Sequence, residues 1–516
     1  MNNDEIGIVT GKTNPYEFFF VINEGKEIAI FDYVMIELRE EGESRNVLCQ
    51  VVDTAASSPA ATEKIPAPAL DRLRQIGMQR IHRLAKARVI GYLKGNSIIM
   101  PKHTVPPMTQ VNIASTEILK EFFVVPSSRA IAIGHLLNRR EVLATLDATK
   151  LNRHLAIMGI TGSGKSNAAG VVIEELHDLG ATVIVLDPHG DYISIKQSAN
   201  GQLYSLHERM TIFSEESRNP FTAKFADIPI LELYDLARIP ETYTHIRRAL
   251  SDGFRSFKKS RGEEGFTPQE LADHLEAMAD EGEGTASSAA ARVRNLARFP
   301  VFGLTNTPLT EILQPQHISV LDLSGLSDAA LQMVCLLLVR RIYEARLNYM
   351  RNTKGETFNR PVFIFLEEAH KFVPAENRAR SSEILRTIAA EGRKFGVFIV
   401  LVTQRPSKVQ ADVLAMCNSQ IIFRIINAQD QTTIQNTSEA MAADLLEDLP
   451  GLNVGEAIII GSVAPAPLAV MFRLRKTKHG GADIDIAAEF KAAKREVNEN
   501  GLIKPEPSEE DVDYIV

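Results

Sequence analysis

The sequence predicts an α/β protein with a mainly parallel sheet, a small β-barrel before that sheet and a helical bundle inserted into it. Three observations predict this fold. From residue 152 onward, apolar runs of strand length alternate with helical segments, which is typical of a parallel sheet covered on both faces. Before residue 145, short β-type runs are separated by Gly, Asn, Pro and charged turns, which is typical of a small barrel. Residues 219–299 are charged and helix-forming.

The composition is that of a folded globular protein of several domains. A length of 516 residues suggests roughly three domains of about 150 residues each. The longest apolar stretch, residues 331–339, is followed by Arg340 and Arg341, well short of the ~18 residues that a membrane helix needs. Asp4 and Glu5 stand where a secretory signal would carry positive charge. We therefore expect a cytoplasmic protein that does not associate with a membrane.

The net charge and the cysteines restrict the classes of site. At a net charge of −8, any nucleic-acid binding must come from local basic patches rather than from the overall field. Cys49, Cys335 and Cys417 lie far apart in the chain, which argues against a disulfide framework and against a cysteine-based zinc site. We expect all three to be inert core thiols.

The N-terminal region, residues 1–145, contains the expected barrel. Its six expected strands are Ile6–Val9, Tyr16–Val21, Val34–Leu38, Val47–Val52, Val89–Tyr92 and Ser97–Met100. The stretch from Pro66 to Ala87 has apolar residues at helical intervals and many arginines. We expect this stretch to be a helical excursion with a solvated face.

The core follows the barrel in two parts, residues 146–218 and 300–479. Its expected buried strands are His154–Gly159, Thr182–Leu186, Ile318–Leu321, Val362–Leu366, Val397–Val402 and Gln420–Ile425. The insertion between the two parts, residues 219–299, has a Gly/Glu/Ser-rich break at Glu281–Ser288 and is expected to be a helical subdomain. Residues 480–516 are expected to form a C-terminal helix and a Pro- and acid-rich tail.

A phosphate-binding motif lies between the first core strand and a helix. Gly159-Ile160-Thr161-Gly162-Ser163-Gly164-Lys165-Ser166 is a complete Gly-x-x-x-x-Gly-Lys-Ser pattern. Its glycines let the backbone curl so that amide N–H groups and the helix N-terminus face the phosphates. We expect Lys165 to reach the β- and γ-phosphates of ATP and the Ser166 hydroxyl to hold Mg²⁺. The predicted nucleotide-binding residues are Gly159, Thr161, Gly162, Ser163, Gly164, Lys165, Ser166, Asn167 and Asp187.

A second motif supplies the carboxylates that a P-loop needs. The apolar strand Val362–Leu366 ends in Glu367-Glu368, which is typical of a Walker B motif. We expect Glu367 to bind Mg²⁺ directly or through its water, and Glu368 to polarise the attacking water as general base. Adjacent acids that end a buried strand are costly without a cation, which disfavours a simple surface turn. Aspartate is the commoner residue at the first position, so direct metal contact by Glu367 is left open.

Two further polar residues end expected strands. Val402-Thr403-Gln404 places an amide where motor ATPases often keep a γ-phosphate sensor. Asp187 ends the second core strand in Asp187-Pro188-His189-Gly190-Asp191-Tyr192, near the switch point where the ligands of such sheets gather. From spacing alone, Asp187 has two open roles, a place in the nucleotide site or the capping of its own turn.

Taken together, five segments resemble the successive motifs of the HerA family, in the HerA/FtsK superfamily. They are the P-loop, Asp187–Tyr192, Glu367-Glu368-Ala369-His370, Glu391-Gly392-Arg393-Lys394-Phe395-Gly396 and Thr403-Gln404-Arg405-Pro406-Ser407. That family has an N-terminal HAS-barrel, a helical bundle inserted in a RecA-like motor and a C-terminal segment that braces the neighbouring subunit. The resemblance therefore covers nearly the whole chain and implies a RecA-like P-loop NTPase core with a HAS-barrel-like domain.

The resemblance also implies a homohexamer with ATP and Mg²⁺ between neighbouring subunits and double-stranded DNA in a central channel. Arg393 matches the position of an arginine finger, which stabilises charge on the phosphoryl group in the next subunit's site. Arg153, just before the P-loop strand, could be a similar finger. For either arginine, the alternative role is a surface salt bridge. The predicted catalytic residues are Glu368, Arg393, Gln404 and Arg153, and the predicted metal ligands are Ser166 and Glu367.

Duplex DNA in a channel is held chiefly through its phosphates, so pore loops should offer Lys and Arg. One group of candidates follows the Walker B acids, namely Lys371, Arg378 and Arg380. A second basic stretch lies in the insertion and comprises Arg247, Arg248, Arg255, Lys258, Lys259 and Arg261. Runs of charge of this kind are usually solvated faces.

Two functions remain open at this point. The first is an ATP-driven translocase or helicase that moves duplex DNA for a NurA-like partner nuclease docked at the barrel, in DNA end resection and double-strand break repair. The second is a HerA-like ATPase ring that serves as scaffold and regulator of a nuclease or NADase effector in antiviral defence. The two functions differ in whether DNA is moved.

Overall fold

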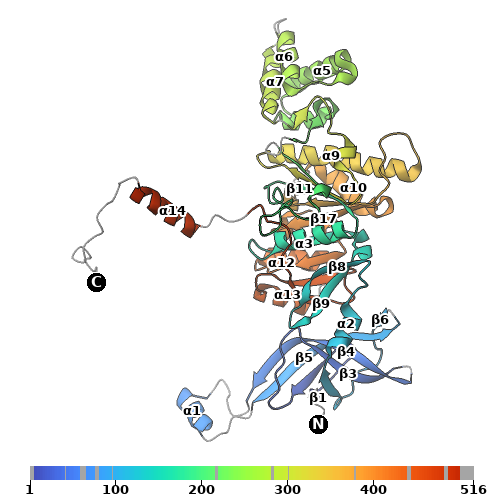
Figure 1. The fold of residues 1–516 in the computed structure, drawn as a ribbon, viewed down its shortest axis with the longest axis vertical. Helices are drawn as coiled ribbons and strands as arrows, with labels where there is room; N and C mark the ends of the chain where they lie inside the picture. The colour runs from blue at the N-terminus through green and yellow to red at the C-terminus, as the bar shows by residue number, and fades with distance from the viewer. Residues whose placement is uncertain are drawn as a thin grey trace, which may run out of the picture.

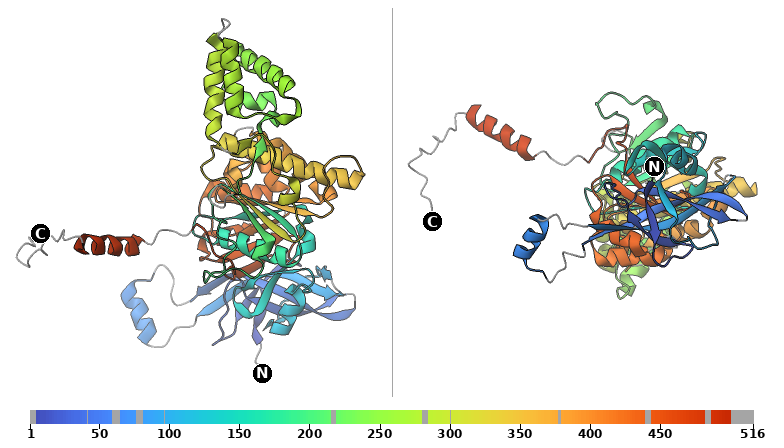
Figure 2. Two further views of the ribbon diagram at one scale, coloured as in Figure 1. Left: turned by 45° about the horizontal axis from the view of Figure 1, so that its top comes forward. Right: turned by 90° about the horizontal axis from the view of Figure 1, so that it is seen from below.

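The molecule is elongated, with the barrel at one end, a large sheet in the middle and a helical subdomain at the other end (Figure 1). The computed structural model describes residues 5–40, 42–58, 65–75, 81–95, 97–214, 219–279, 284–299, 301–376, 379–438, 443–481 and 486–499. The left view of Figure 2 shows the same succession of three bodies, and the right view looks along the long axis from the barrel end.

Six antiparallel strands close the N-terminal barrel, as the sequence predicts. They are β1 (Glu5–Thr10), β2 (Glu17–Ile22), β3 (Tyr33–Glu40), β4 (Glu43–Ser57), β5 (His82–Lys94) and β7 (Gln110–Ile113). The order is β2-β1-β7-β3-β4-β5, and β5 pairs with β2 to complete the circle. The short β6 (Ser97–Ile99) extends β5 as a hairpin. Strand β7 was not expected from the sequence.

The expected helical excursion at Pro66–Ala87 is shorter than predicted. Helix α1 covers only Ala67–Gln75, whereas β5 begins at His82 and pairs with both β2 and β4. Buried Ala85, Ala87 and Val89 alternate with more exposed residues along β5, and this period of two marks one face of a strand. Alanine and arginine favour a helix locally, and cross-strand pairing overrides that preference.

The large sheet has eleven strands, of which seven run parallel. The parallel strands, in spatial order, are β12 (Met210–Phe213), β15 (His317–Asp322), β11 (Thr182–Asp187), β16 (Val362–Leu366), β17 (Val397–Thr403), β10 (Leu155–Met158) and β18 (Ser419–Ile422). All six expected core strands are among them. Four antiparallel strands continue the sheet, namely β19 (Glu456–Gly461), β20 (Leu468–Phe472), β8 (Ala130–Leu136) and β9 (Arg139–Asp147).

The hairpin of β8 and β9 belongs to the large sheet rather than to the barrel. Strand β8 pairs with β20, with Leu136 opposite Val470, so the predicted division at residue 145 separates β8 from β20 and falls within β9. Helix α2 (Thr116–Phe123) lies between the barrel and this hairpin. Its Phe123 ring lies 5.1 Å from the ring of Tyr33 in the barrel, and the two bodies therefore share packed side chains.

Helices cover both faces of the parallel strands. On β11, Val183 and Val185 pack in the same cluster as α3 (Lys165–Asp178). The alternate residues Ile184 and Leu186 pack in the cluster of α9 (Asp328–Arg351) and α10 (Arg380–Phe395). Burial on both faces explains why these strands are continuous apolar runs. Smaller helices are α8 (Leu309–Ile312), α11 (Ala411–Ala415), α12 (Ala428–Thr437) and α13 (Ala443–Asp448).

The insertion is helical, as predicted. It contains α4 (Ile230–Leu236), α5 (Thr244–Arg261), α6 (Pro268–Ala279) and α7 (Gly284–Arg294), with the strand pair β13 (Ala223–Lys224) and β14 (Phe302–Gly303) at its base. The rings of Phe254 and Phe257 pack against Phe266 at 5.4 and 5.0 Å. Part of the expected Gly/Glu/Ser-rich break lies outside the described residues, and α7 already begins at Gly284.

The predicted C-terminal helix is α14 (Ile486–Glu499), while the predicted tail lies outside the described residues. Cys49, Cys335 and Cys417 are all buried free thiols, which confirms that prediction. Within the described part of the chain, no helix combines the length and the apolar composition that a membrane crossing requires.

Candidate nucleotide site

Three predicted motifs meet at the carboxyl edge of the large sheet because their strands are neighbours. Strand β17 lies between the P-loop strand β10 and the acidic strand β16. Met158 at the end of β10 is paired with Thr403, and Leu366 at the end of β16 is paired with Leu401. Parallel strands in register end at one edge, so the P-loop, Gln404 and the two glutamates lie side by side.

The P-loop has the backbone that a phosphate cradle needs. Gly159, Gly162 and Gly164 have φ values of 155°, 75° and 114°, a region that other residues rarely adopt. A Cβ atom at Gly159 would lie 2.5 Å from Cβ of Phe423. The Ser163 hydroxyl donates to the Ile160 carbonyl at 2.7 Å and fixes the curl of the loop.

Lys165 is buried and lies along the loop. Its Nζ donates to the Ile160 carbonyl oxygen at 2.9 Å. Burial lowers the pKa of this amine, and the charges of Glu368, Glu367 and Asp191 oppose that effect. The ammonium group therefore faces an acidic cluster within the site.

The two Walker B glutamates have pKa values shifted in opposite directions. Burial raises the pKa of Glu367 to about 8, and nearby Asp187, Asp191 and Glu368 add to the rise. Burial also raises the pKa of Glu368, but His370 and Lys165 outweigh it and leave the value below the usual range. His370 Nδ1 lies 3.3 Å from Glu368 Oε2. Two acids with separated pKa values can take different roles.

Glu368 also carries backbone strain. It has φ 50° and ψ 55°, the left-handed region that glutamate rarely adopts. Non-glycine residues held in this region are concentrated at functional sites. The strained backbone and the ionised carboxyl both agree with the predicted role of a general base.

Gln404 directly follows β17 and lies against the P-loop. The Thr161 hydroxyl of the loop donates to Gln404 Oε1. The predicted sensor amide is thus in direct contact with the predicted phosphate cradle, although the two residues are 243 positions apart.

The structure gives two predicted nucleotide ligands other partners. Both carboxylate oxygens of Asp187 accept backbone N–H groups, from His189 and Gly190 and from Tyr192, at 2.8–3.2 Å. Of the two roles left open by spacing, the geometry shows the capping of this turn. The Asn167 side chain contacts the segment at residues 473–475 rather than the loop.

Arg153 and Arg393 lie at the opposite, amino edge of the sheet. Arg153 precedes β10, and Arg393 is in the last turn of α10, just before β17. A strand of four residues spans about 13 Å, so neither side chain is placed beside its own P-loop. Both are exposed, and neither side chain has a hydrogen bond or ion pair within the described residues.

The local packing fixes where Arg393 stands. A Cβ atom on the preceding Gly392 would lie 2.3 Å from the Val397 carbonyl oxygen, so only glycine allows α10 to approach β17 this closely. Buried Arg346 of α9 donates to the Phe395 carbonyl at 2.8 Å. The end of α10 is therefore rigidly placed while the Arg393 side chain extends outward.

The donor set at the carboxyl edge fits Mg²⁺. The Ser166 hydroxyl and the Glu367 carboxylate are hard oxygen donors, which this cation prefers. Within the described ranges there is no group of three or more His, Cys, Asp or Glu side chains that could hold a metal by themselves. Mg²⁺ is commonly bound by one or two protein oxygens together with substrate phosphates, so the site suits a cation that arrives with a nucleotide.

The predicted DNA-contacting residues are mostly paired within the chain. Arg380 binds Glu232 at 2.9 Å and also contacts Asp235, both on α4, so this predicted pore residue instead joins α10 to the insertion. Arg378 lies outside the described residues. In the insertion, Arg261 binds Glu270 at 2.8 Å. Arg247 contacts the Tyr234 ring and donates to the Ile239 carbonyl. Arg248 pairs with Asp252, and Lys258 donates to the Ala226 carbonyl.

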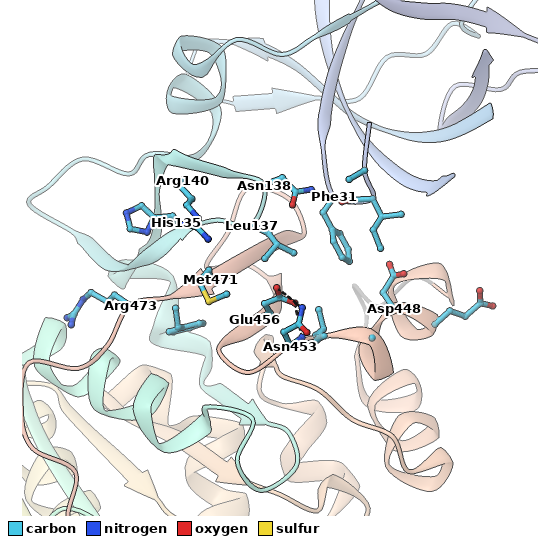
Figure 3. Close-up of a pocket in the computed structure, with 16 residues that line it drawn as sticks. Phe31, His135, Leu137, Asn138, Arg140, Asp448, Asn453, Glu456, Met471 and Arg473 are labelled. Atoms are coloured by element: carbon cyan, nitrogen blue, oxygen red, sulfur yellow. Dashed lines mark hydrogen bonds between the residues drawn. The ribbon is translucent and has the colours of Figure 1, made fainter. Parts of the chain in front are cut away.

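A separate cavity of about 800 Å³ lies where the barrel meets the motor. Figure 3 shows Phe31 of the barrel, Arg140 of β9 and Asp448 of α13 around it. None of the predicted site residues lines this cavity. The turn before β19 on its floor does contact the P-loop, because the Gly455 N–H donates to the Ser163 carbonyl at 2.9 Å.

Sequence reasoning assigned no role to three residues of this region, Tyr192, His370 and Arg475. Tyr192 ends the motif Asp187–Tyr192, and His370 ends the motif that begins at Glu367. Their places in these motifs could have indicated a role for both. Arg475 has no such signal, because it lies about 300 residues from the P-loop helix that it contacts.

Comparison with known proteins agrees with this geometry. The family model described as "Helicase HerA, central domain" matches residues 131–342, and the "HAS barrel domain" matches residues 6–95. A probable helicase of Methanocaldococcus jannaschii is 29% identical over 94% of this chain and 94% of its own length. This chain therefore contains a HerA-type central domain and a HAS-barrel domain.

Several relatives of this chain carry the name HerA. The "DNA double-strand break repair helicase HerA" of Pyrococcus furiosus is 28% identical over 95% of this chain and 97% of its own length. Among solved structures, VirB4 of Thermoanaerobacter pseudethanolicus has a TM-score of 0.50 at 13% identity, over 66% of this chain and 96% of that one. The last likeness shows the fold alone.

Proposed function

We propose that this chain is an ATP-driven DNA translocase or helicase whose subunits form a hexameric ring around duplex DNA. The observation that carries the proposal is the division of one ATPase site between the two edges of the sheet. The P-loop, Glu367, Glu368 and Gln404 stand at the carboxyl edge, and the exposed Arg153 and Arg393 stand at the amino edge. A ring of like subunits brings the two edges together.

The residues at the carboxyl edge have properties that suit ATP hydrolysis. Lys165 is positioned to exchange its bond with the Ile160 carbonyl for bonds to the β- and γ-phosphates. Glu368, with its lowered pKa, can accept the proton of the attacking water. Gln404 can orient that water or contact the γ-phosphate. Bound Mg²⁺, held by Ser166 and Glu367, would neutralise charge on the phosphates.

The residues at the amino edge would complete the site of the next subunit. The Arg393 guanidinium would stabilise the negative charge that spreads over the transferring phosphoryl group. Arg153 stands at the same edge and is proposed to assist it. Neither arginine is engaged by an acid of the described chain, so both are free to bind a neighbour.

The named relatives support DNA as the substrate and repair as the process. Several carry the name "DNA double-strand break repair helicase HerA", with 26–28% identity to this chain over most of its length. We propose that this ring likewise acts in DNA end resection, with a NurA-like nuclease docked at the barrel. The barrel lies at one end of the molecule (Figure 1), where a partner could cap the ring.

The decisive experiment measures whether DNA drives the ATPase and is moved by it. We expect linear duplex DNA to stimulate ATP hydrolysis by the assembled protein, and ATP to drive displacement of a third strand from a triplex substrate. Lys165→Ala should abolish both activities. The measurement is repeated with the candidate nuclease bound. If duplex DNA changes neither activity in either assembly, the translocase proposal is wrong and a ring that regulates an effector is favoured.

A further inference from the structure

A buried arginine of the C-terminal segment, Arg475, contacts the ring of Tyr192, and Tyr192 in turn contacts the Walker B acid Glu367. Arg475 is only 6% exposed, and its Nε donates to the Thr477 hydroxyl at 3.0 Å. Its two terminal nitrogens are buried and make no hydrogen bond within the described residues. A buried guanidinium without a carboxylate partner is costly. Such a group needs another source of stabilisation.

That stabilisation comes from an aromatic ring. The guanidinium carbon of Arg475 lies 5.2 Å from the ring centroid of Tyr192, within the range of a cation–π contact. Such contacts are strongest where both groups are shielded from water, and Tyr192 is fully buried. Arg475 and Tyr192 therefore form one unit, although they belong to opposite ends of the motor sequence.

The P-loop helix holds Arg475 in this position. The Asn167 side chain donates to the Arg473 carbonyl at 2.8 Å and accepts the Arg475 N–H at 2.9 Å. One turn further along α3, a Cβ atom at Gly170 would lie 2.7 Å from Arg475 Nε. Gly170 thus provides the room that the guanidinium occupies. Arg473 also binds Glu174 and Glu175 of α3, at 3.2 and 2.8 Å.

Tyr192 in turn contacts the acid that is proposed to bind the metal. Its hydroxyl donates to Glu367 Oε1, and its backbone N–H donates to Asp187 Oδ2 at 2.8 Å. The ring is fixed at its backbone by Asp187 and on its face by Arg475. The hydroxyl occupies one oxygen of Glu367, and the other oxygen makes no hydrogen bond within the described residues.

We propose that Tyr192, held by Arg475, is a positioning residue that orients the Glu367 carboxylate for the metal of the ATPase site. This inference rests on the proposed function. Groups that hydrogen-bond a metal-binding carboxylate fix its orientation, and their loss weakens metal binding. A cation on the face of a phenol ring also makes its hydroxyl a stronger donor. The metal site thus depends on the C-terminal segment, residues 473–481, as well as on the P-loop and the Walker B strand.

The test is Tyr192→Phe, which removes one hydroxyl and keeps the ring. Binding of a fluorescent ADP to the assembled protein is measured as Mg²⁺ is titrated, and again in EDTA. We expect the Mg²⁺ concentration at half-saturation to rise about tenfold or more, while the ADP affinity in EDTA stays within about twofold. A structural defect would lower both, so the Mg²⁺-free measurement separates the two cases.

Tyr204→Phe is the matched control. Tyr204 is a largely buried tyrosine in the chain that follows β11, and its hydroxyl makes no hydrogen bond within the described residues. We expect this variant to bind Mg²⁺ and ADP as the unaltered protein does. An equal Mg²⁺ shift in both variants would contradict a specific role for Tyr192.

Arg475→Met tests the second part of the proposal. Methionine keeps much of the length and removes the charge, and we expect a smaller shift in the same direction. Because both residues act through one hydroxyl, the double variant should be no worse than Tyr192→Phe alone. An unchanged Mg²⁺ midpoint in Tyr192→Phe overturns the proposal, whatever the result for Arg475→Met. If the unaltered protein binds no Mg²⁺–nucleotide at all, the proposed function fails instead.

Discussion

The two edges of the large sheet differ in how their charged side chains are partnered. At the carboxyl edge, the charged groups face one another, with Lys165 among Glu367, Glu368 and Asp191. At the amino edge, Arg153 and Arg393 extend into solvent without an acidic partner in the described chain. The carboxyl edge thus gathers acids around one lysine, and the amino edge exposes two arginines without acids beside them.

This difference fits a site to which both edges contribute, as proposed. A surface ion pair would have satisfied Arg393 at little cost, since such pairs contribute about 0–1 kcal/mol. Instead, Gly392 and Arg346 fix the helix end from which it extends. An arginine that is rigidly based and unpaired is suited to an interface. The comparison therefore favours sites that are completed between subunits, and the following predictions test it.

Loss of Arg393 has the largest expected effect. In Arg393→Ala, ATP turnover should fall by about 10³-fold or more, because the finger stabilises charge only in the transition state. Nucleotide binding should be retained. Steady-state hydrolysis and equilibrium binding of a fluorescent ADP measure the two. Lys394→Ala, at the adjacent exposed position, is the control and should keep turnover within about twofold. Equal losses in both variants would deny Arg393 a special role.

Glu368→Gln tests the role of the carboxyl edge in ATP turnover. Turnover should fall by about 10²- to 10⁴-fold, the usual worth of a general base, while ATP stays bound because glutamine keeps the shape of the side chain. Retention of radiolabelled ATP on the protein measures the second effect. Unchanged hydrolysis would remove the general-base assignment.

A mixture of these two inactive variants tests whether the edges work across a subunit boundary. When they are assembled together, some interfaces combine an intact Glu368 with an intact Arg393 from the neighbouring subunit. We expect the mixture to recover turnover that neither variant shows alone. No recovery, in mixed rings of demonstrated composition, would mean that both residues act within one subunit.

Arg153→Ala should have a smaller effect than Arg393→Ala. An assisting cation is expected to be worth about tenfold in turnover, or ~1.4 kcal/mol. Steady-state hydrolysis measures it, with oligomeric state as the check on assembly. Turnover equal to that of the unaltered protein would leave Arg153 as a surface residue.

His154 joins the strand after Arg153 to the helix of Arg393, and its titration should affect stability. Its Nδ1 accepts the Ile399 N–H at 2.9 Å and its Nε2 contacts the Ala389 carbonyl at 3.1 Å. This network requires a neutral ring, and burial lowers the pKa of His154 to about 4. The unfolded chain binds the proton more tightly, so stability is lost as the pH falls from about 6.5 to 4, by about 3 kcal/mol.

Denaturant unfolding at pH 7 and pH 4.5 measures this loss. His177 and His317 also have pKa values lowered by burial, so the contribution of His154 is the difference in pH dependence between the unaltered protein and His154→Asn. Asparagine keeps a polar side chain that can accept a hydrogen bond at this position. Equal pH dependence in both proteins would contradict the assignment.

Much of the motor could be predicted from the sequence because its signals are local. The P-loop spacing, the apolar strand before Glu367 and the alternation of strands with helices are all contained in short windows. Strand β5 shows where such windows fail. Residues 82–87 favour a helix by composition, and pairing with β2 and β4 decides otherwise. Strands β8 and β9 show a second limit of prediction from short windows, because nothing in their local sequence indicates which sheet they join.

The same distinction between local and long-range information applies to the candidate site. The sequence determined by itself which residues have the chemistry of a P-loop ATPase, because the glycine spacing, the P-loop lysine and the paired glutamates each form a pattern within a short window. Only the tertiary structure decided that Asp187 and Asn167 brace the backbone, that Arg153 and Arg393 stand across the sheet from the P-loop, and that Arg475 lies behind Tyr192. These contacts join residues far apart in the chain, and their partners depend on strand order and helix packing.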